Sequence, residues 1–242
     1  MAMITVTADD LGLSPGVNAG IIEAHRSGPV ANASLMVHGR AVDGIDEVMM
    51  TCPGLAIGLH IDLGEWEYRD DGWVASYERV DTDNPDAVAR EVADQLLRFE
   101  RLVGGPPTHL DSHQHIHRDG AAAGIIAATA AQLAVPLREV THAYLGGFYG
   151  QDQKSRPVPE ALTAVAWAKL LSECAAPLTE LSCHPSILAD TGSIYDVERI
   201  VEMEVLTSAE VADACAASGH QFVRLDGLPT RAGAAVTRMR DH

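Results

Sequence analysis

The sequence predicts an α/β fold of the (β/α) barrel-like type, which we expect to be a distorted seven-stranded parallel barrel. Short β-type runs alternate with longer helical stretches, as a parallel sheet requires. The 242 residues are enough for one such domain, and we find no linker, repeat or low-complexity segment. We therefore expect residues 1–242 to form a single domain. A doubly wound open sheet is the competing arrangement.

Candidate strands are short runs rich in β-branched or other apolar residues. Helical stretches separate most of them, so consecutive strands are expected to run parallel. The longest irregular insertion, residues 64–84, follows the third strand. The seven runs are Ile4–Ala8, Ala33–Val37, Leu55–Leu63, Thr108–His113, Pro136–Val140, Leu178–Cys183 and Gln221–Leu225.

The helical stretches carry apolar residues at steps of three and four positions. The first is expected to begin with Ser14 as its cap and Pro15 as its first residue, and to end at Gly28. A second stretch, residues 85–105, places apolar side chains on one stripe and ends at a glycine pair. The alanine-rich segments 119–135 and 159–176 predict two further helices.

The composition excludes several classes of function. A formal charge of −17 argues against nucleic-acid binding, because a phosphate backbone needs a basic surface. Four widely spaced cysteines without a CxxC pair indicate reduced thiols rather than disulfides. The N-terminal segment lacks a basic start, and no 18-residue apolar run occurs, so we expect neither a signal peptide nor a membrane span. These features predict a cytoplasmic protein.

Four predicted strand ends carry residues that bind metals or move protons. Functional groups gather at the carboxyl ends of parallel strands, and these ends read TADD, GLHIDL, THLDSHQHIH and ELSCHP. In the last of them, His184 precedes Pro185, where a strand would stop. Alternate positions share one face of a strand; in the two middle segments they are Gly58, His60 and Asp62, then His109, Asp111, His113, His115 and His117.

These residue types together predict a divalent-metal site. The adjacent carboxylates Asp9 and Asp10 repel each other unless water or a cation compensates. A lone histidine such as His60 is more often a hydrogen-bonded core residue, but burying several imidazoles requires partners or a metal ion. One aspartate with two histidines leaves coordination positions open for water and substrate. Because imidazole is a softer ligand than oxygen, this set suits Zn, Co, Mn or Fe better than Mg.

Six stretches of the sequence resemble the YdjC-like (ChbG/HpnK) carbohydrate deacetylase family. They are TADDLGLSPGVNAGIIEAHRSG, GLHIDL, PTHLDSHQHIH, FYG at 148–150, LSCHP and MEVLTS, in the family's order over nearly the whole chain. The resemblance implies a (β/α) barrel-like, metal-dependent hydrolase that removes acetyl groups from N-acetylated sugars. Its chemistry would be similar to that of NodB-type polysaccharide deacetylases.

The resemblance also implies roles for individual residues. Metal ligands fall on Asp10, His60 and His113, a catalytic carboxylate on Asp9 and a catalytic histidine on His184. In this interpretation Asp9 is the base that takes a proton from water, and His184 is the acid that protonates the departing amine. The resemblance implies Mg²⁺ whereas imidazole ligands favour Zn²⁺, so we expect one divalent ion, with Mg²⁺ and Zn²⁺ both open.

Further residues are expected to orient the ligands or to contact substrate. His109 and Asp111 are candidates to orient His113. Arg138 is a candidate to keep Asp9 ionised or to contact substrate. Trp66 and Trp73 either form platforms for sugar rings or only anchor the insertion that contains them. Tyr68 and Tyr149 are candidates for the same platforms, and His115 and His117 either reach the substrate cleft or are solvated.

Two other functions stay open on the sequence. One is a metal-dependent hydrolase of another bond, of the amidohydrolase or phosphoesterase type, although the HxH of amidohydrolase barrels belongs on the first strand. The other is a non-catalytic sugar-binding protein, which the presence of every expected ligand disfavours. The sugar is also open among chitooligosaccharides, a glycosylated lipid and an aminoglycoside precursor. Relatives of the family suggest a homodimer.

Overall fold

Parallel strands form the centre of the molecule. The computed structural model describes residues 2–69, 72–152 and 156–228, so residues 229–242 of the expected domain lie outside the described part. Seven strands of the described chain form one sheet of order β6-β3-β2-β1-β8-β7, and β9 pairs with the start of β1. Their pairings are parallel. The strands are β1 (Met3–Leu11), β2 (Asn32–Leu35), β3 (Ala56–Ile61), β6 (Leu110–Ser112), β7 (Ala143–Leu145), β8 (Leu178–Cys183) and β9 (Gln221–Phe222).

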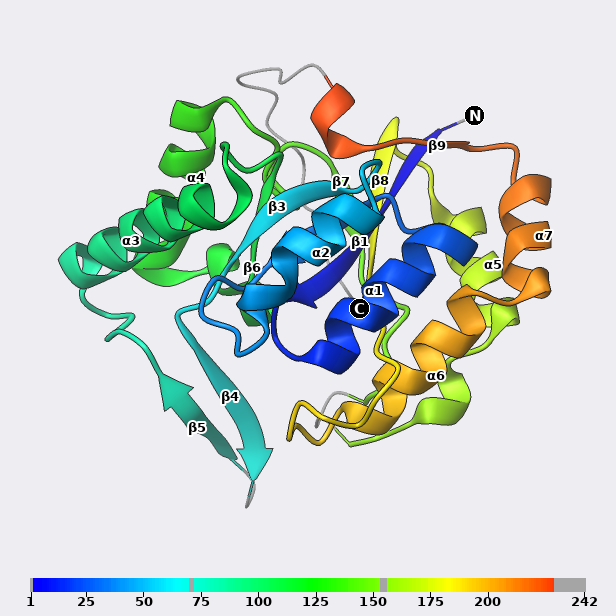
Figure 1. Cartoon of the computed structure of the whole chain (residues 1–242), viewed down its shortest axis with the longest axis horizontal. Coiled ribbons are helices and arrows are strands. Elements are labelled where there is room, and N and C mark those ends of the chain that lie inside the picture. The colour runs from blue at the N-terminus through cyan, green and yellow to red at the C-terminus, as the bar shows by residue number, and fades with distance from the viewer. Residues whose placement is uncertain (1, 70–71, 153–155, 229–242) are drawn as a thin grey trace.

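Helices cover the outer side of this sheet (Figure 1). Each packs against the next in the order α4-α3-α2-α1-α6-α7-α5, which follows the order of the strands. The sheet is thus a half-barrel with a helical layer, which confirms the predicted (β/α) barrel-like class. Among the described helices, none combines the length and apolarity needed to cross a bilayer. They are α1 (Pro15–Ser27), α2 (Ile45–Thr51), α3 (Pro85–Val103), α4 (Gly120–Leu133), α5 (Ala164–Glu173), α6 (Asp196–Leu206) and α7 (Ala209–Ala217).

Local sequence signals set the ends of the predicted helices. The Ser14 hydroxyl accepts the N–H of Val17 at 3.1 Å, and Pro15 is the first residue of α1. Helix α3 begins in the same way, with Asn84 as its N-cap and Pro85 as its first residue. It ends before Gly104, whose φ of 80° is the left-handed conformation that glycine adopts without strain.

The two faces of the sheet differ in polarity. Along β1, Ile4, Val6 and Ala8 are fully buried in the core that the helices share. The alternate residues Thr5 and Thr7 point to the concave side, because side chains alternate along a strand. The same side carries other buried polar residues, among them Asn32, Ser34, Asp111, Glu180 and Ser182. Polar side chains that could not enter the helical core are therefore collected inside the half-barrel.

The predicted strand Pro136–Val140 is wrong. Only Leu137 forms a bridge, with Leu110, and the next three residues turn. The turn forms because the Thr141 hydroxyl accepts the N–H of Leu137 at 3.1 Å and donates to its carbonyl at 3.0 Å. The strand that does form here is β7, a few residues later.

The insertion at residues 64–84 is not irregular but contains an antiparallel hairpin of β4 (Gly64–Arg69) and β5 (Gly72–Glu78). It projects from the body of the molecule (Figure 1). Asp62 holds its base by accepting the hydroxyl of Tyr77 at 3.0 Å. The side-chain amide of Gln114 pairs with both backbone groups of Trp66, at 2.9 and 2.8 Å. The hairpin is thus tied to the loop that follows His113.

Candidate active site

The end of β1 turns two adjacent carboxylates toward the same side. In a regular strand Asp9 and Asp10 would point to opposite faces. The register of β1 on β2 shifts between Ala8 and Leu11, and Asp10 has a φ of 66°. Aspartate tolerates this left-handed conformation better than most residues. The bulge therefore brings the carboxylate of Asp10 to the concave side beside that of Asp9.

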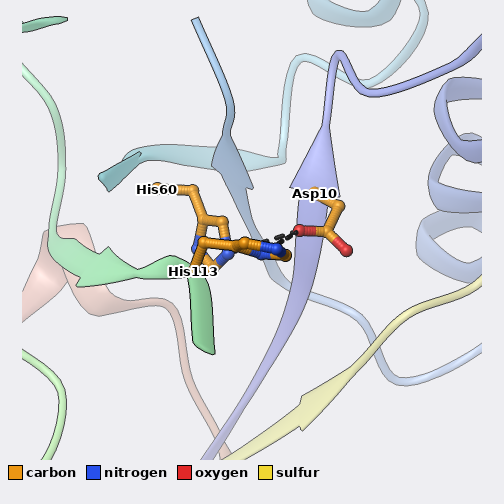
Figure 2. Close-up of side chains that lie close together, drawn as sticks. All are labelled: Asp10, His60 and His113. Carbon is orange, nitrogen blue, oxygen red and sulfur yellow. Dashed lines mark ion pairs between the residues drawn. The ribbon is translucent and has the colours of Figure 1, made fainter. Parts of the chain in front are cut away.

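The side chains of Asp10, His60 and His113 converge on one point (Figure 2). The Oδ1 atom of Asp10 lies 3.3 Å from Nε2 of His60 and 3.4 Å from Nδ1 of His113. His60 comes from β3, and His113 follows β6 directly. Three strand ends that are distant in sequence thus supply one group of donor atoms.

Two neighbours determine which atoms face this point. Arg199 donates to Oδ2 of Asp10 at 2.5 Å, so Oδ1 is left facing the imidazoles. Asp111 accepts from Nδ1 of His60 at 2.8 Å. Because a carboxylate supplies no proton, Nδ1 carries one, and Nε2 is the atom left to face Oδ1 of Asp10 or to bind a metal ion. Such a carboxylate–imidazole pair is typical of histidines that bind metals.

The geometry of the three donor atoms fits a divalent cation. Ligand atoms about 2.0–2.2 Å from a tetrahedral ion are about 3.3–3.6 Å apart, and the separations here are 3.3 and 3.4 Å. The Oδ1 atom of Asp10 is buried and has no hydrogen-bond partner in the described structure, an environment that a cation would satisfy. A neighbouring group of Asp9, His60 and Asp111 already has a cation, because Arg138 contacts both carboxylates.

Arg138 is the centre of a buried ionic network. Its side chain is 1% exposed and donates to the two oxygens of Asp9, both at 2.7 Å. It also donates to Glu180 at 2.9 Å and lies 2.7 Å from Oδ2 of Asp111. One guanidinium therefore compensates three buried carboxylates, and its planar fork fixes the orientation of Asp9. Each oxygen of Asp9 keeps a free acceptor position, since a carboxylate has about four.

His184 approaches Asp9 from β8. Its Nε2 atom lies 3.7 Å from Oδ2 of Asp9, and its Nδ1 atom lies 3.8 Å from Oε1 of Glu202. The backbone N–H of His184 donates to the other oxygen of Glu202 at 2.5 Å. The ring of Tyr149 packs edge-on at 4.9 Å between centroids. His184 therefore has one nitrogen at the site and the other beside a buried carboxylate.

The buried charges shift pKa values in the site. Burial lowers the pKa of His60, but Asp111 and Asp10 outweigh burial and raise it well above the ordinary value. Burial raises the pKa of Asp10, but Arg199 and His113 hold it well below the ordinary range. In the absence of a cation the site thus favours a proton on His60. A metal ion would replace that proton, because imidazole binds metals in its neutral form.

Comparison with known proteins shows the family of this chain. The family model described as YdjC-like protein matches residues 3–217. The chain belongs to the YdjC-like family. A curated relative, the chitooligosaccharide deacetylase of Salmonella typhimurium, is 31% identical over 251 aligned positions, which cover 90% of this chain and 96% of the relative.

Solved structures of other proteins share the fold of this YdjC-like chain. An Enterococcus faecalis structure, described as a candidate cellobiose-phosphate cleavage protein, has a TM-score of 0.79 at 25% identity and covers 94% of this chain and 99% of its own. A CE4 esterase from Streptococcus mutans has a TM-score of 0.58 at 16% identity, covering 91% of this chain and 84% of its own. The second likeness concerns the fold alone.

The two residues expected to orient His113 contact other partners in this YdjC-like chain. Asp111 bonds to His60, and the ring of His109 lies between the hydroxyls of Ser34 and Thr108, at 3.1 and 2.9 Å. The strand alternation that suggested the pairing ends at Ser112. Beyond His113 the backbone turns through the left-handed residues Gln114 and His115, so His115 and His117 do not continue the face of the strand.

The predicted aromatic contacts divide between the cleft and the hairpin. A large cleft on the concave side is lined by the metal-ligand candidates, by Tyr149, and by Glu65 and Glu67 of β4. Because side chains alternate along β4, Trp66 lies on the opposite face from these glutamates. Trp73 is 58% exposed and packs edge-on against Tyr68. The described structure therefore brings Tyr149 to the site but neither tryptophan.

Sequence reasoning missed three charged residues of the site, Arg199, Glu202 and Glu180. Arg199 and Glu202 are buried on α6, one turn apart and in line with the buried Leu206. Charged side chains on the apolar stripe of a helix were the available signal, because such residues are rarely buried unless paired. Glu180 sits inside the predicted strand Leu178–Cys183, where an isolated acidic residue gave the same signal.

Proposed function

We propose that this chain is a metal-dependent N-deacetylase that acts on N-acetylated sugars. The observation that carries the proposal is the convergence of Asp10, His60 and His113 beside Asp9 and His184. The curated relatives named chitooligosaccharide deacetylases support an acetylated oligosaccharide as the substrate. The acidic side chains of the cleft disfavour a phosphorylated one.

The residues Asp10, His60 and His113 would hold the ion. A divalent cation in that position supplies Lewis acidity, which polarises a carbonyl and lowers the pKa of water. Two imidazoles with one carboxylate favour Zn²⁺ over Mg²⁺ by ligand type. Asp111 and Arg199 would keep the donor atoms in place, each through the hydrogen bond described above.

Asp9 would act as the general base. Arg138 fixes its carboxylate in one plane and compensates its charge, while each oxygen keeps an acceptor position for a water proton. A base held within reach of its proton typically contributes about 10²- to 10⁴-fold to the rate. This geometry gives Asp9 one orientation for every turnover.

His184 would act as the general acid. An amine is a poor leaving group until its nitrogen is protonated, and Nε2 of His184 lies on the site side, 3.7 Å from Asp9. The carboxylate of Glu202 beside Nδ1 would stabilise the imidazolium that donates this proton, as an aspartate does in catalytic triads. Glu202 is thus a positioning residue rather than a catalytic one.

The test combines metal content by mass spectrometry with acetate release from N-acetylglucosamine oligomers. We expect His60→Ala with His113→Ala to lose both the ion and the activity. We expect Asp9→Asn to keep the ion and to lower kcat at least about 100-fold. His38→Ala is the matched control, because His38 lines a separate pocket beside Glu91.

Three outcomes would contradict parts of this proposal. Full metal content in the double variant would reject the ligand set. Normal turnover in Asp9→Asn would reject the base. A metal-loaded wild-type enzyme that releases no acetate would reject the substrate class while leaving the metal site in place.

We also propose that the protein is a cytoplasmic homodimer. The four cysteines, Cys52, Cys174, Cys183 and Cys215, are free in the structure, which supports a reducing compartment. The family resemblance supports the dimer. Light scattering on the purified full chain tests the oligomeric state, and a mass equal to one chain would reject it.

A further inference from the structure

A second group of ligand-type side chains lies beside the same cleft. One nitrogen each of His115 and His117 and one oxygen of Glu139 lie within 4.8 Å of one another. The Nδ1 atom of His115 is 3.6 Å from Oε1 of Glu139, and the two imidazole centroids are 5.7 Å apart. We propose that these three residues bind a second divalent cation of the zinc class. The inference goes beyond the proposed deacetylation, which requires only the first ion.

The inner nitrogens of both rings are held by hydroxyl groups. Nδ1 of His117 lies 2.6 Å from the hydroxyl of Ser112, which also accepts the backbone N–H of His117 at 3.0 Å. Nε2 of His115 lies 3.3 Å from the hydroxyl of Tyr144. Hydroxyls donate or accept as required, so both rings can present a lone pair at the other nitrogen. For His115 that other nitrogen is the one that faces Glu139.

The ring nitrogens that no hydroxyl contacts have no hydrogen-bond partner in the described part of the chain. Nδ1 of His115 and Nε2 of His117 are both buried and unpartnered in the described part of the chain, and His117 is only 4% exposed. Buried polar atoms are nearly always paired, because leaving one unpaired carries its full desolvation cost. A cation bound to both nitrogens and to Glu139 would remove that cost at two atoms together.

Arg118 is the present counter-charge of Glu139. Its Nε donates to Oε2 of Glu139 at 2.8 Å, and a second nitrogen contacts Oε1. The Arg118 side chain is 41% exposed, and ion pairs at such positions contribute little to stability. A carboxylate has about four acceptor positions, so Oε2 can keep Arg118 while Oε1 binds the ion. Because Arg118 also contacts Oε1, it competes with the cation for that oxygen.

The donor types select the class of ion. Two imidazoles and one carboxylate suit Zn²⁺, Co²⁺ or Mn²⁺ and are poor ligands for Ca²⁺ and Mg²⁺, which prefer oxygen. The three residues line the cleft, so the ion would exchange with solvent and keep open positions. They share no residue with the group formed by Asp10, His60 and His113. The two sites can therefore be removed one at a time.

Zinc stoichiometry of the full chain tests the proposal. After equilibrium dialysis against free Zn²⁺, mass spectrometry of the metal should give two ions for the wild type. It should give one for Glu139→Gln and one for Asp10→Asn. Zinc affinity at the second site should fall at least about tenfold in Glu139→Gln. Glu173→Gln is the matched control, since Glu173 lines the cleft elsewhere, and it should keep two ions.

Arg118→Met provides the discriminating variant. If Arg118 competes with the ion, removing its charge should tighten zinc binding at the second site, whereas a purely structural cluster predicts no change. One ion in wild type that is lost in Asp10→Asn, or two ions retained in Glu139→Gln, would overturn the proposal. One ion in wild type that persists in Asp10→Asn and is lost in Glu139→Gln would instead overturn the ligand set of the first site. The two failures are thus distinguishable.

Discussion

Replacing Arg138 by methionine removes the charge that three buried carboxylates share. Asp9, Asp111 and Glu180 are each at most 3% exposed, and all three contact the guanidinium at 2.7–2.9 Å. Removing one partner of a single buried ion pair costs about 3–5 kcal/mol. Three carboxylates lose this contact, although His60 still contacts Asp111 and His142 still contacts Glu180. We therefore expect a loss at the upper end of that range, about 5 kcal/mol. In a protein of this size that corresponds to a fall in Tm of about 10–20 °C.

The loss of stability in Arg138→Met should be smaller at lower pH. Burial raises the pKa of Glu180, but Arg138 and His142 hold it well below its ordinary value of 4.5 in the native protein. Stability from this carboxylate is therefore present above pH 4.5 and is lost as pH falls through the native pKa. In Arg138→Met, burial acts without the guanidinium and should raise that pKa. The difference in free energy of unfolding between Arg138→Met and wild type should then become smaller as pH falls from about 8 to about 5.

Urea denaturation at several pH values measures both effects. The matched control is Arg224→Met, because this side chain is 46% exposed and pairs with Asp226; its loss should stay within about 1 kcal/mol. A loss for Arg138→Met as small as that of the control would refute the network. A large loss that does not change with pH would refute its electrostatic origin and leave only packing.

Three further changes test other parts of the structure. Gly58→Ala should cost about 1–3 kcal/mol in urea denaturation, because the new Cβ would lie 2.5 Å from the ring of His109; a neutral effect would contradict that packing. Ser14→Ala should lower the free energy of unfolding by about 1–2 kcal/mol, since the hydroxyl caps α1, and an unchanged urea midpoint would contradict it. Gln114→Ala should speed hydrogen exchange at the backbone amide of Trp66, because that N–H donates to Oε1 of Gln114 at 2.9 Å. Unchanged protection of this amide would show that other contacts hold the hairpin.

The predicted helices were correct where local chemistry decides. Ser14 with Pro15, and Asn84 with Pro85, satisfy the first free N–H groups of their helices whatever the rest of the chain does. The strand Leu178–Cys183 has the predicted bounds. Pro136–Val140 failed because the hydroxyl of a later residue, Thr141, stabilises a turn that strand patterning does not reveal.

The site was predictable in its residue types but not in its pairings. Alternation along the third segment suggested that Asp111 and His109 would serve His113. The register of β3 on β6 instead places His60 opposite Asp111, which decides that Asp111 orients His60. A shift of two positions in register would have changed that partner while leaving the same side chains on the concave face, so the alternation of polar and apolar residues does not select between these registers.

The sequence by itself determined which donor groups this protein possesses and that they stand at the ends of parallel strands, because composition and strand periodicity are local properties. Only the tertiary structure decided which of them meet. The bulge at Asp10 turns a residue that should face away toward its neighbour Asp9. Arg138 reaches Asp9 across 129 positions of sequence. Such contacts depend on the packing of distant segments, and that packing is settled by the energy of the whole fold rather than by any short stretch of it.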